Sequence, residues 1–255
     1  MSKLRLSASQ LSLFIACKRK WYFRYVEKIK EPYRPWLKAG LDFHQCIENC
    51  FKKLAGEDVG IDYFDNDIRD MVKIAWEKGI IYVPDTHIVE KKIALPINEH
   101  AEMTGFIDLL DVTDGKIIDH KTFKRPMDCL TEQDLKENLQ LMIYAYWYLY
   151  KLDKKKGVWL RHNQINKIDP EASKYTEVWV SRKHVETYWN ENILPVVEEL
   201  VEMQGQEKEK FTCTLARCGD YGGCPYQDNC DGYKYLTEQE GVDDEIMSIV
   251  QGNDK

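Results

Sequence analysis

Residues 104–122 read TGFIDLLDVTDGKIIDHKT, and this stretch decides the fold. Two apolar runs flank the pair Asp114-Gly115, which is a strong signal for a β-hairpin closed by a two-residue type I′ turn. A loop of two residues also fixes the register of the strands, so Thr113 is predicted to lie opposite Lys116. We therefore expect two antiparallel strands whose remaining residues pair outward from this turn.

Three charged side chains lie within these otherwise apolar strands. In the predicted register Leu110 lies opposite Asp119, and Asp108 lies opposite Lys121. Opposed residues share one face of a sheet, so the three charges emerge together, with the two aspartates as diagonal neighbours about 7–8 Å apart. The alternative is an exposed hairpin face with one weak ion pair, but apolar neighbours make unpaired charges costly there.

This arrangement of charges indicates metal-assisted hydrolysis. Two carboxylates can hold Mg²⁺ or Mn²⁺, which polarises a phosphodiester oxygen and lowers the pKa of a bound water. A nearby lysine orients or deprotonates that water and stabilises the negative charge that develops. Asp108, Asp119 and Lys121 are therefore predicted to be catalytic, with both aspartates as metal ligands.

The rest of the chain alternates between helical and strand patterns. A further helix after the break PYRPW at 32–36 carries His44 beside its apolar stripe. Strands are predicted over 87–97, in GVWLRHN and in YTEVWVS. The remaining helices are predicted over 9–26, 65–79, 131–152 (with Thr131 as its cap) and 182–204 (bent or restarted at Pro195).

Composition and charge indicate a globular protein with a basic end. The chain has 255 residues, of which 44% are hydrophobic and 31% are charged. We see no apolar run long enough to span a bilayer and no secretory signal, so a cytoplasmic location without membrane contact is expected. Residues 1–40 hold ten Lys and Arg against two Glu, while the whole chain carries −7. Such a basic patch on an acidic body can contact nucleic-acid phosphates locally.

The second half of the first predicted helix, KRKWYFRY at 18–25, interleaves basic and aromatic residues. Single-stranded nucleic-acid channels use this mixture for phosphate contact and base stacking. A core helix with a solvated cationic face is the alternative interpretation. The residues predicted to contact DNA phosphates are Lys18, Arg19, Lys20, Arg24, Lys124 and Arg125.

The chain contains eight cysteines, and three of them fall in CGDYGGCPYQDNC at 218–230. Because cytosolic thiols are kept reduced, such clustering indicates metal binding rather than disulfides. One possibility is a local tetrahedral Zn²⁺ site in which Cys213 is the fourth ligand.

Two short motifs resemble those of the PD-(D/E)XK nuclease superfamily. They are GFID, which ends in Asp108, and IDHK, which supplies Asp119 and Lys121. Further features resemble its RecB-type branch, among them the opening segment SASQLSLFIACKRKWYFRYV. His44 in AGLDFHQCI is similar to the histidine of that branch that ligates the metal. Its Gln-x-x-x-Tyr motif, which helps to position the catalytic strand and the DNA, matches Gln140 and Tyr144 in QLMIY.

The cysteines add to this resemblance. In a subset of the branch, which includes AddAB-type helicase-nucleases and CRISPR-adaptation nucleases, four cysteines bind a 4Fe-4S cluster. The family commonly has Cys-x-x-Cys, five residues and a third Cys, whereas Tyr221 stands here where the nearer cysteine would be. The Zn²⁺ site with Cys213 therefore stays open as the alternative. The cluster ligands that the resemblance implies are Cys17, Cys218, Cys224 and Cys230.

The resemblance implies an α/β fold, a restriction-endonuclease-like core with a central mixed β-sheet flanked by helices. It implies one nuclease domain over 1–238, whose N-terminal helix (7–30) and tail (205–238) form a cysteine-rich seam. Residues 239–255 are acidic and poor in apolar residues, so we expect them to be disordered.

The function implied is a Mg²⁺- or Mn²⁺-dependent deoxyribonuclease of a bacterium or phage. An exonuclease that acts on single-stranded DNA or DNA ends is expected, in recombination, repair or phage replication and with a possible protein partner from those processes. Two alternatives stay open, a structure-specific endonuclease and a non-catalytic DNA-binding module with a structural zinc site.

Overall fold

A computed structural model of the protein describes residues 3–32, 35–151, 155–219 and 223–232. The segment 239–255, predicted to be disordered, lies outside the described residues. The chain forms two compact units. The first, the sheet unit, comprises Met1–Arg5 and Arg34–Pro195, and the second, the cysteine unit, comprises Leu6–Tyr33 and Val196–Lys255.

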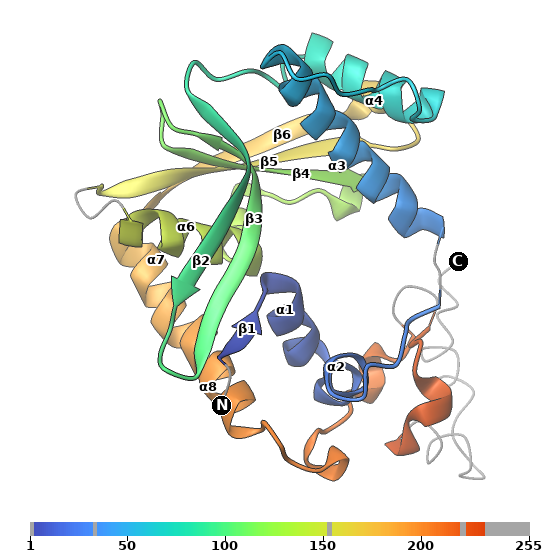
Figure 1. Ribbon diagram of the computed structural model, residues 1–255, viewed down its shortest axis with the longest axis vertical. Coiled ribbons are helices and arrows are strands. Elements are labelled where there is room, and N and C mark those ends of the chain that lie inside the picture. Colours follow the sequence, from blue (N-terminus) through green and yellow to red (C-terminus); the bar gives the residue numbers. More distant parts are fainter. Residues whose placement is uncertain (1–2, 33–34, 152–154, 220–222, 233–255) are drawn as a thin grey trace. The chain divides into compact units, whose positions relative to one another are not determined.

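A mixed β-sheet forms the centre of the sheet unit (Figure 1). Its strands follow the order β1-β3-β4-β5-β6, and β2 also pairs with β3. The β4–β5 pair is parallel, whereas β2–β3, β3–β4 and β5–β6 are antiparallel. The predicted central mixed sheet is therefore confirmed. The strands are β1 (Leu4–Leu6), β2 (His87–Pro96), β3 (Ala101–Asp111), β4 (Lys116–Phe123), β5 (Gly157–Asn166) and β6 (Lys174–Ser181).

Helices cover both faces of this sheet, α3 and α4 on one side and α6 and α7 on the other (Figure 1). The predicted cap is present, because the Thr131 hydroxyl accepts a hydrogen bond from the backbone N–H of Asp134. None of the helices in the described part of the chain is long and apolar enough to cross a membrane. The helices are α1 (Ala8–Ala16), α2 (Lys18–Tyr25), α3 (Pro35–Leu54), α4 (Asn66–Glu77), α5 (Glu132–Lys136), α6 (Leu139–Lys151), α7 (Arg182–Tyr188) and α8 (Leu194–Glu202).

The hairpin register differs from the prediction. Asp111 pairs with Lys116, so the loop has four residues rather than two. A type I′ turn needs a positive φ at both central residues, but only Gly115 has one (+69°). The Asp111 carboxylate instead accepts a hydrogen bond from the backbone N–H of Asp114 at 3.1 Å, which supports a wider turn.

The corrected register places Leu110 opposite Ile117. One step beyond the last ladder pair, Asp108 then comes opposite Asp119 rather than opposite Lys121. A shift of two residues preserves the side-chain alternation, whereas a shift of one would reverse it. The prediction of the pairing was therefore wrong, while the two aspartates still meet across neighbouring strands.

Three of the predicted helices are interrupted. The helix predicted over 9–26 breaks at Cys17, whose backbone is extended (φ −163°, ψ 109°), so that α1 and α2 are separate. The helix over 131–152 divides into α5 and α6. The helix over 182–204 contains a π-helical turn at Trp189–Ile193, which ends two residues before Pro195. Proline has no N–H, so one helical hydrogen bond is missing there.

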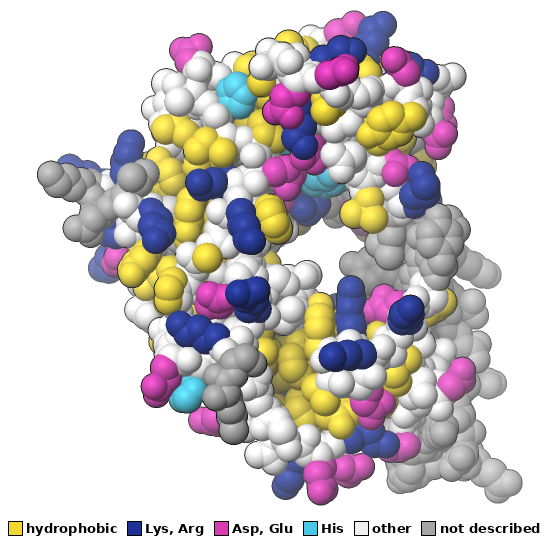
Figure 2. All heavy atoms as spheres, in the orientation of Figure 1, with side chains coloured by type: hydrophobic (Ala, Val, Ile, Leu, Met, Phe, Trp, Pro, Cys, Tyr) yellow, Lys and Arg dark blue, Asp and Glu magenta, His cyan; other side chains and the backbone are white. Residues whose placement is uncertain are grey.

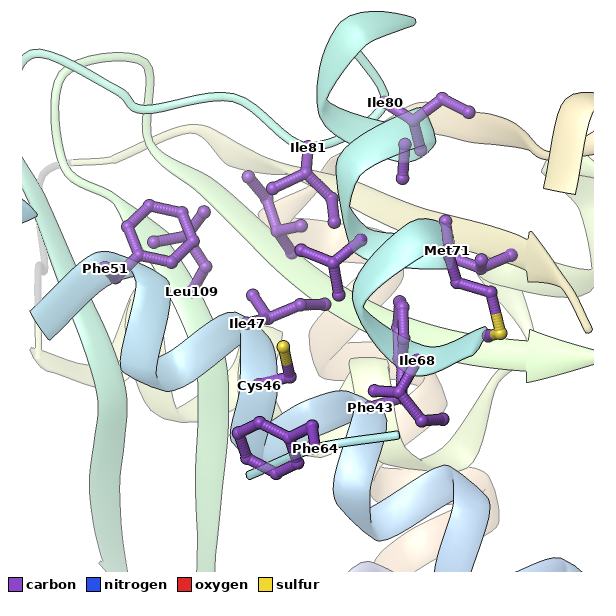
Figure 3. Packing of buried hydrophobic residues seen from close by; sticks show 14 residues of the cluster. Phe43, Cys46, Ile47, Phe51, Phe64, Ile68, Met71, Ile80, Ile81 and Leu109 are labelled. Atoms are coloured by element: carbon purple, nitrogen blue, oxygen red, sulfur yellow. The ribbon is translucent and has the colours of Figure 1, made fainter. Parts of the chain in front are cut away.

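The core between α3, α4 and the sheet fixes the position of the site (Figure 3). From α3, Phe43, Ile47 and Phe51 are buried against Leu109 of β3 and other sheet residues. Truncating one such phenylalanine to alanine typically costs about 3–5 kcal/mol. Because this packing anchors α3, the adjoining His44 is held next to β3.

The cysteine unit has shorter elements. Phe23 of α2 packs with Tyr226 and Cys230 in a small buried cluster. Trp21 stacks on Phe211, with ring centroids 6.0 Å apart. The N-terminal and C-terminal segments of the chain thus meet within one unit.

Candidate active site and cysteine site

His44 and Asp108 meet beside β4. His44 Nδ1 lies 3.3 Å from Asp108 Oδ2, and that oxygen also accepts a hydrogen bond from the backbone N–H of His120 at 2.8 Å. Burial alone would lower the pKa of His44, but the hydrogen bond and charge of Asp108 outweigh it and raise the pKa. The pair therefore favours a positive charge at this point, either a proton on His44 or a cation.

Asp119 is buried, and both of its carboxylate oxygens contact donors. Lys121 Nζ lies 2.8 Å from Oδ1, and His162 Nε2 of β5 lies 3.2 Å from Oδ2. Burial would raise the pKa of Asp119, but Lys121 and His162 hold it well below its usual range. Asp119 is thus a carboxylate at every pH at which the protein would work.

Lys121 is held in its charged form. Burial lowers its pKa, but the nearby Asp119 and Asp108 raise it by more, so that the net shift is upward. A protonated lysine can donate hydrogen bonds and stabilise negative charge, whereas it cannot accept a proton. Of the two predicted roles for Lys121, this environment favours charge stabilisation.

The predicted metal ligands lie near one another in the structure, but they are not arranged as a closed metal-binding site. In the residues that the structure describes, no three His, Cys, Asp or Glu side chains are grouped as they would be around one ion. Acidic, basic and histidine side chains nevertheless lie next to one another where α3 meets β3 and β4 (Figure 2). The donors, two carboxylates and an imidazole, are of the kind that Mg²⁺ or Mn²⁺ accepts.

Gln140 and Tyr144 share one face of α6, as their spacing predicts. Gln140 Nε2 donates to the Tyr144 hydroxyl at 3.1 Å. Burial raises the pKa of Tyr144 to about 12, so its phenol keeps its proton. The ring lies close to β3, because a Cβ atom on Gly105 would come within 3.0 Å of it. The motif thus packs against β3, the strand that carries Asp108.

Glu90 of β2 lies beside the candidate site, and the sequence interpretation missed it. It lies between the ladder pairs Val89–Leu109 and Lys91–Ile107, which puts it opposite Asp108. Its φ is +48°, an uncommon conformation for a residue with a side chain. Burial, together with the charge of Asp108, raises its pKa to about 7. The available signal was an acid inside the strand pattern HIVEKKIALPI.

Most of the predicted phosphate contacts have partners within the protein. Lys18 pairs with Glu199, Arg24 with Glu31, and Arg125 with Asp128. Arg19 is buried, donates to the Phe211 carbonyl at 2.7 Å and lies 3.6 Å from Asp231. Lys20 lies beside the cysteines. A role in DNA contact stays a prediction for each of these residues.

Lys124 has a different environment. The backbone N–H of Lys167 donates to the Phe123 carbonyl at 2.9 Å, so Lys124 and Lys167 follow the neighbouring ends of β4 and β5. Burial and the charge of Lys124 lower the pKa of Lys167. Among the described residues neither lysine has an acidic partner. Lys167 had no signal in the sequence, because only the parallel pairing brings it beside Lys124.

In the cysteine unit, five thiols line one cavity, together with Arg19, Lys20, Phe23 and Gln227. The break between α1 and α2 brings Cys17 to this cavity, where its sulfur accepts a hydrogen bond from the Thr214 N–H at 3.4 Å. Burial, followed by the neighbouring thiols, raises the pKa of Cys218 to about 12. Binding of a metal by cysteines requires the thiols to lose their protons. The five are Cys17, Cys213, Cys218, Cys224 and Cys230.

Comparisons with known proteins agree with this geometry. The family model of the PD-(D/E)XK nuclease superfamily matches residues 5–231. The solved structure of SSO0001 is similar, with 16% identity, a TM-score of 0.51 and coverage of 91% of this chain and 88% of that one. A candidate exonuclease from Eubacterium rectale has 11% identity, a TM-score of 0.55 and coverage of 93% and 90%. At these identities the likeness is one of fold, and no curated protein matches the sequence.

Proposed function

Because the chain belongs to the PD-(D/E)XK nuclease superfamily, we propose that this nuclease is a Mg²⁺- or Mn²⁺-dependent exonuclease that acts on single-stranded DNA or DNA ends. One observation carries the proposal. Asp108 and Asp119 oppose each other on β3 and β4, with His44 at 3.3 Å from the first and Lys121 at 2.8 Å from the second. This combination of hard donors and a fixed cation suits phosphodiester hydrolysis.

His44, Asp108 and Asp119 would hold the metal. When bound, the ion polarises the phosphate and lowers the pKa of the attacking water. Lys121 Nζ donates to Asp119 Oδ1 and is placed to stabilise charge on a phosphate oxygen. His162 restrains the other oxygen of Asp119, which fixes the plane of the carboxylate. Tyr144 and Gln140 would position β3 and the DNA.

The DNA path is proposed to run past the ends of β4 and β5. Lys124 and Lys167 form a pair of positive charges there, and a phosphate is the natural partner for two lysines without an acid. The E. rectale neighbour with a similar fold is itself a candidate exonuclease, and action on ends is part of our proposal for this chain. A cytoplasmic role in recombination, repair or phage replication, with protein partners from those processes, fits such an activity.

A 4Fe-4S cluster is proposed for the cysteine unit, with Cys17, Cys218, Cys224 and Cys230 as ligands. A cluster holds its four thiolates farther apart than a single Zn²⁺ does. The five thiols that line the cavity offer enough ligands for either group. Zn²⁺ with Cys213 is the alternative. Brown protein whose absorbance near 400 nm disappears in Cys17→Ser would support the cluster, and colourless anaerobic protein with stoichiometric zinc would refute it.

The activity is tested with labelled linear and circular DNA of the same sequence, each as single strands and as duplex. With Mn²⁺ we expect the linear single strands to be degraded from an end, circles to survive, and Asp119→Asn to be inactive. Cleavage of circles would instead indicate the endonuclease alternative. If the wild type and Asp119→Asn leave every substrate intact, the non-catalytic alternative replaces the proposal. Comparison of 5′ and 3′ labels then gives the polarity.

A further inference from the structure

A buried chain of hydrogen bonds leads from Arg161 to His120 within the sheet unit. Arg161 Nε donates to Asn163 Oδ1 at 2.8 Å. Asn163 Nδ2 lies 3.1 Å from His120 Nδ1. All three side chains are buried, with residue exposures of 5% for Arg161, 1% for Asn163 and 2% for His120. Neighbouring parallel strands hold the last two, since His120 of β4 is registered with Asn163 of β5.

Arg161 itself is fixed at several points. Its Nη2 donates to the Ile80 carbonyl at 2.8 Å, and its guanidinium lies 3.6 Å from the centre of the Tyr175 ring. Glu177 lies 3.4 Å from Nη1. A guanidinium has donors and no acceptor. The atom of Asn163 that faces Arg161 Nε must therefore be the amide oxygen.

This constraint determines the tautomer of His120. With its oxygen turned to Arg161, Asn163 presents its NH₂ group to His120 Nδ1. A ring nitrogen that accepts a hydrogen bond carries no proton, so the proton of the neutral ring lies on Nε2.

The Nε2–H of His120 has no hydrogen-bond partner in the described part of the protein, although it is fully shielded. Buried donors without a partner are rare in proteins, because such a donor loses its hydrogen bonds to water and gains none in return. The ring lies beside the candidate metal ligands: its centroid is 6.4 Å from that of His44, in a T-shaped arrangement. Its own backbone N–H binds Asp108.

We propose that the Arg161–Asn163 pair fixes His120 as a hydrogen-bond donor for one oxygen atom in the active site, a water or a phosphate oxygen beside His44 and Asp108. His120 is therefore not a metal ligand, because its Nε2 carries a proton and its Nδ1 faces Asn163. Arg161 and Asn163 are positioning residues that act through His120. The role of the oxygen rests on the proposed nuclease function, whereas the tautomer does not.

Asn163→Asp tests the proposal directly. An aspartate of the same shape keeps an acceptor for Arg161 but offers His120 a second acceptor, so the proton should move to Nδ1. Long-range ¹H–¹⁵N spectra of the histidine rings distinguish the two tautomers. We expect the Nε2–H form in the wild type, the Nδ1–H form in Asn163→Asp, and a kcat for DNA hydrolysis that falls about tenfold, the effect of one hydrogen bond, with KM little changed.

Asn98→Asp is the matched control. Asn98 Oδ1 accepts hydrogen bonds from the His100 and Ala101 N–H groups, a role that aspartate can keep. We expect this variant to retain the wild-type tautomer and kcat. An Nδ1–H or cationic His120 in the wild type would overturn the proposal, as would an Asn163→Asp protein that is folded by circular dichroism and has both properties unchanged. If no variant hydrolyses DNA, the tautomer result still decides whether the pair fixes His120.

Discussion

The sheet unit and the cysteine unit hold their functional side chains in different ways. In the sheet unit, Asp119 has Lys121 and His162 at 2.8 and 3.2 Å. In the cysteine unit, five thiols face one cavity, and the contact from Thr214 to Cys17 is a weak N–H···S interaction of 3.4 Å. The first site is organised by the protein's own hydrogen bonds, whereas we expect the second to be organised by the metal proposed to bind it.

The apolar packing differs in the same sense. The cluster under α3 and α4 contains 14 buried residues, which come from both helices, three strands and the loops on either side of α4 (Figure 3). Among the residues that the structure describes, the cluster that holds Cys230 has Phe23 and Tyr226 as its other buried members. Small cores usually need a metal or disulfides to be stable. The comparison teaches that loss of metal should affect catalysis in one unit and folding in the other.

The largest effect is expected from Lys121→Gln. Removal of this fixed cation should lower kcat by about 10²–10³-fold, because charge on the phosphate loses its donor. The melting temperature should change little, since Lys121 is partly exposed. Steady-state kinetics on end-labelled DNA measure the loss. Lys73→Gln, which removes a lysine of α4 that pairs with Glu77, should behave as the wild type.

Removal of metal from the cysteine unit should unfold that unit and leave the sheet unit intact. We expect Cys218→Ser to lose its bound metal and to be cut by protease within 6–33 or 196–255. Cys129→Ser, outside the cavity, should keep both metal and resistance. Limited proteolysis with mass spectrometry and metal analysis measure the effect. Equal cleavage of wild type and Cys218→Ser would show that the two units do not differ in this respect.

Lowering the pH should reduce the free energy of unfolding, because His120 is buried. Burial lowers its pKa to about 4, below the ordinary value near 6.5. Between these pH values the unfolded chain binds a proton that the folded protein does not, so stability falls as the pH drops from 6.5 to 4. The loss approaches about 3 kcal/mol. Urea unfolding over this pH range should show a steeper dependence of the free energy of unfolding on pH in the wild type than in His120→Gln. The same pH dependence in both proteins would contradict the explanation.

The smallest effect is expected from Lys167→Gln. In an Asp119→Asn background, which we expect to bind DNA without cutting it, the slope of log affinity against log salt should decrease by about 0.7 for single strands. Fluorescence anisotropy over a salt series measures it. Lys73→Gln again serves as the control. An unchanged slope would remove Lys167 from the DNA path.

Local patterns predicted much of the sheet unit. The apolar strands, the helix with Gln140 and Tyr144, and the sheet with helices on both faces followed from periodicity and from the family resemblance. The hairpin register was wrong because the Asp111 carboxylate binds the backbone of its own turn. The turn propensity of the pair Asp114-Gly115 does not take that contact into account. The error was harmless to the site because a shift of two residues preserves the faces of the strands.

Residues brought together by non-local pairing could not be predicted from the sequence. His162 reaches Asp119, and Asn163 reaches His120, only because β4 and β5 are parallel with that register. Cys17 faces the cavity because the helix breaks there, whereas the continuous apolar pattern of the sequence predicts an unbroken helix. Glu90 adopts a positive φ that nothing in its strand pattern indicates. These features depend on the tertiary structure, whereas the acids and Lys121 were visible in a single stretch.

The central claim is that Asp108 of β3 and Asp119 of β4, on neighbouring strands, together hold a divalent metal. Electron paramagnetic resonance of free Mn²⁺ during a titration tests it without DNA. We expect the wild type and Cys218→Ser to bind Mn²⁺ alike, and Asp108→Asn and Asp119→Asn to bind it at least tenfold more weakly. Equal Mn²⁺ affinity in the wild type and in both aspartate variants would contradict the claim.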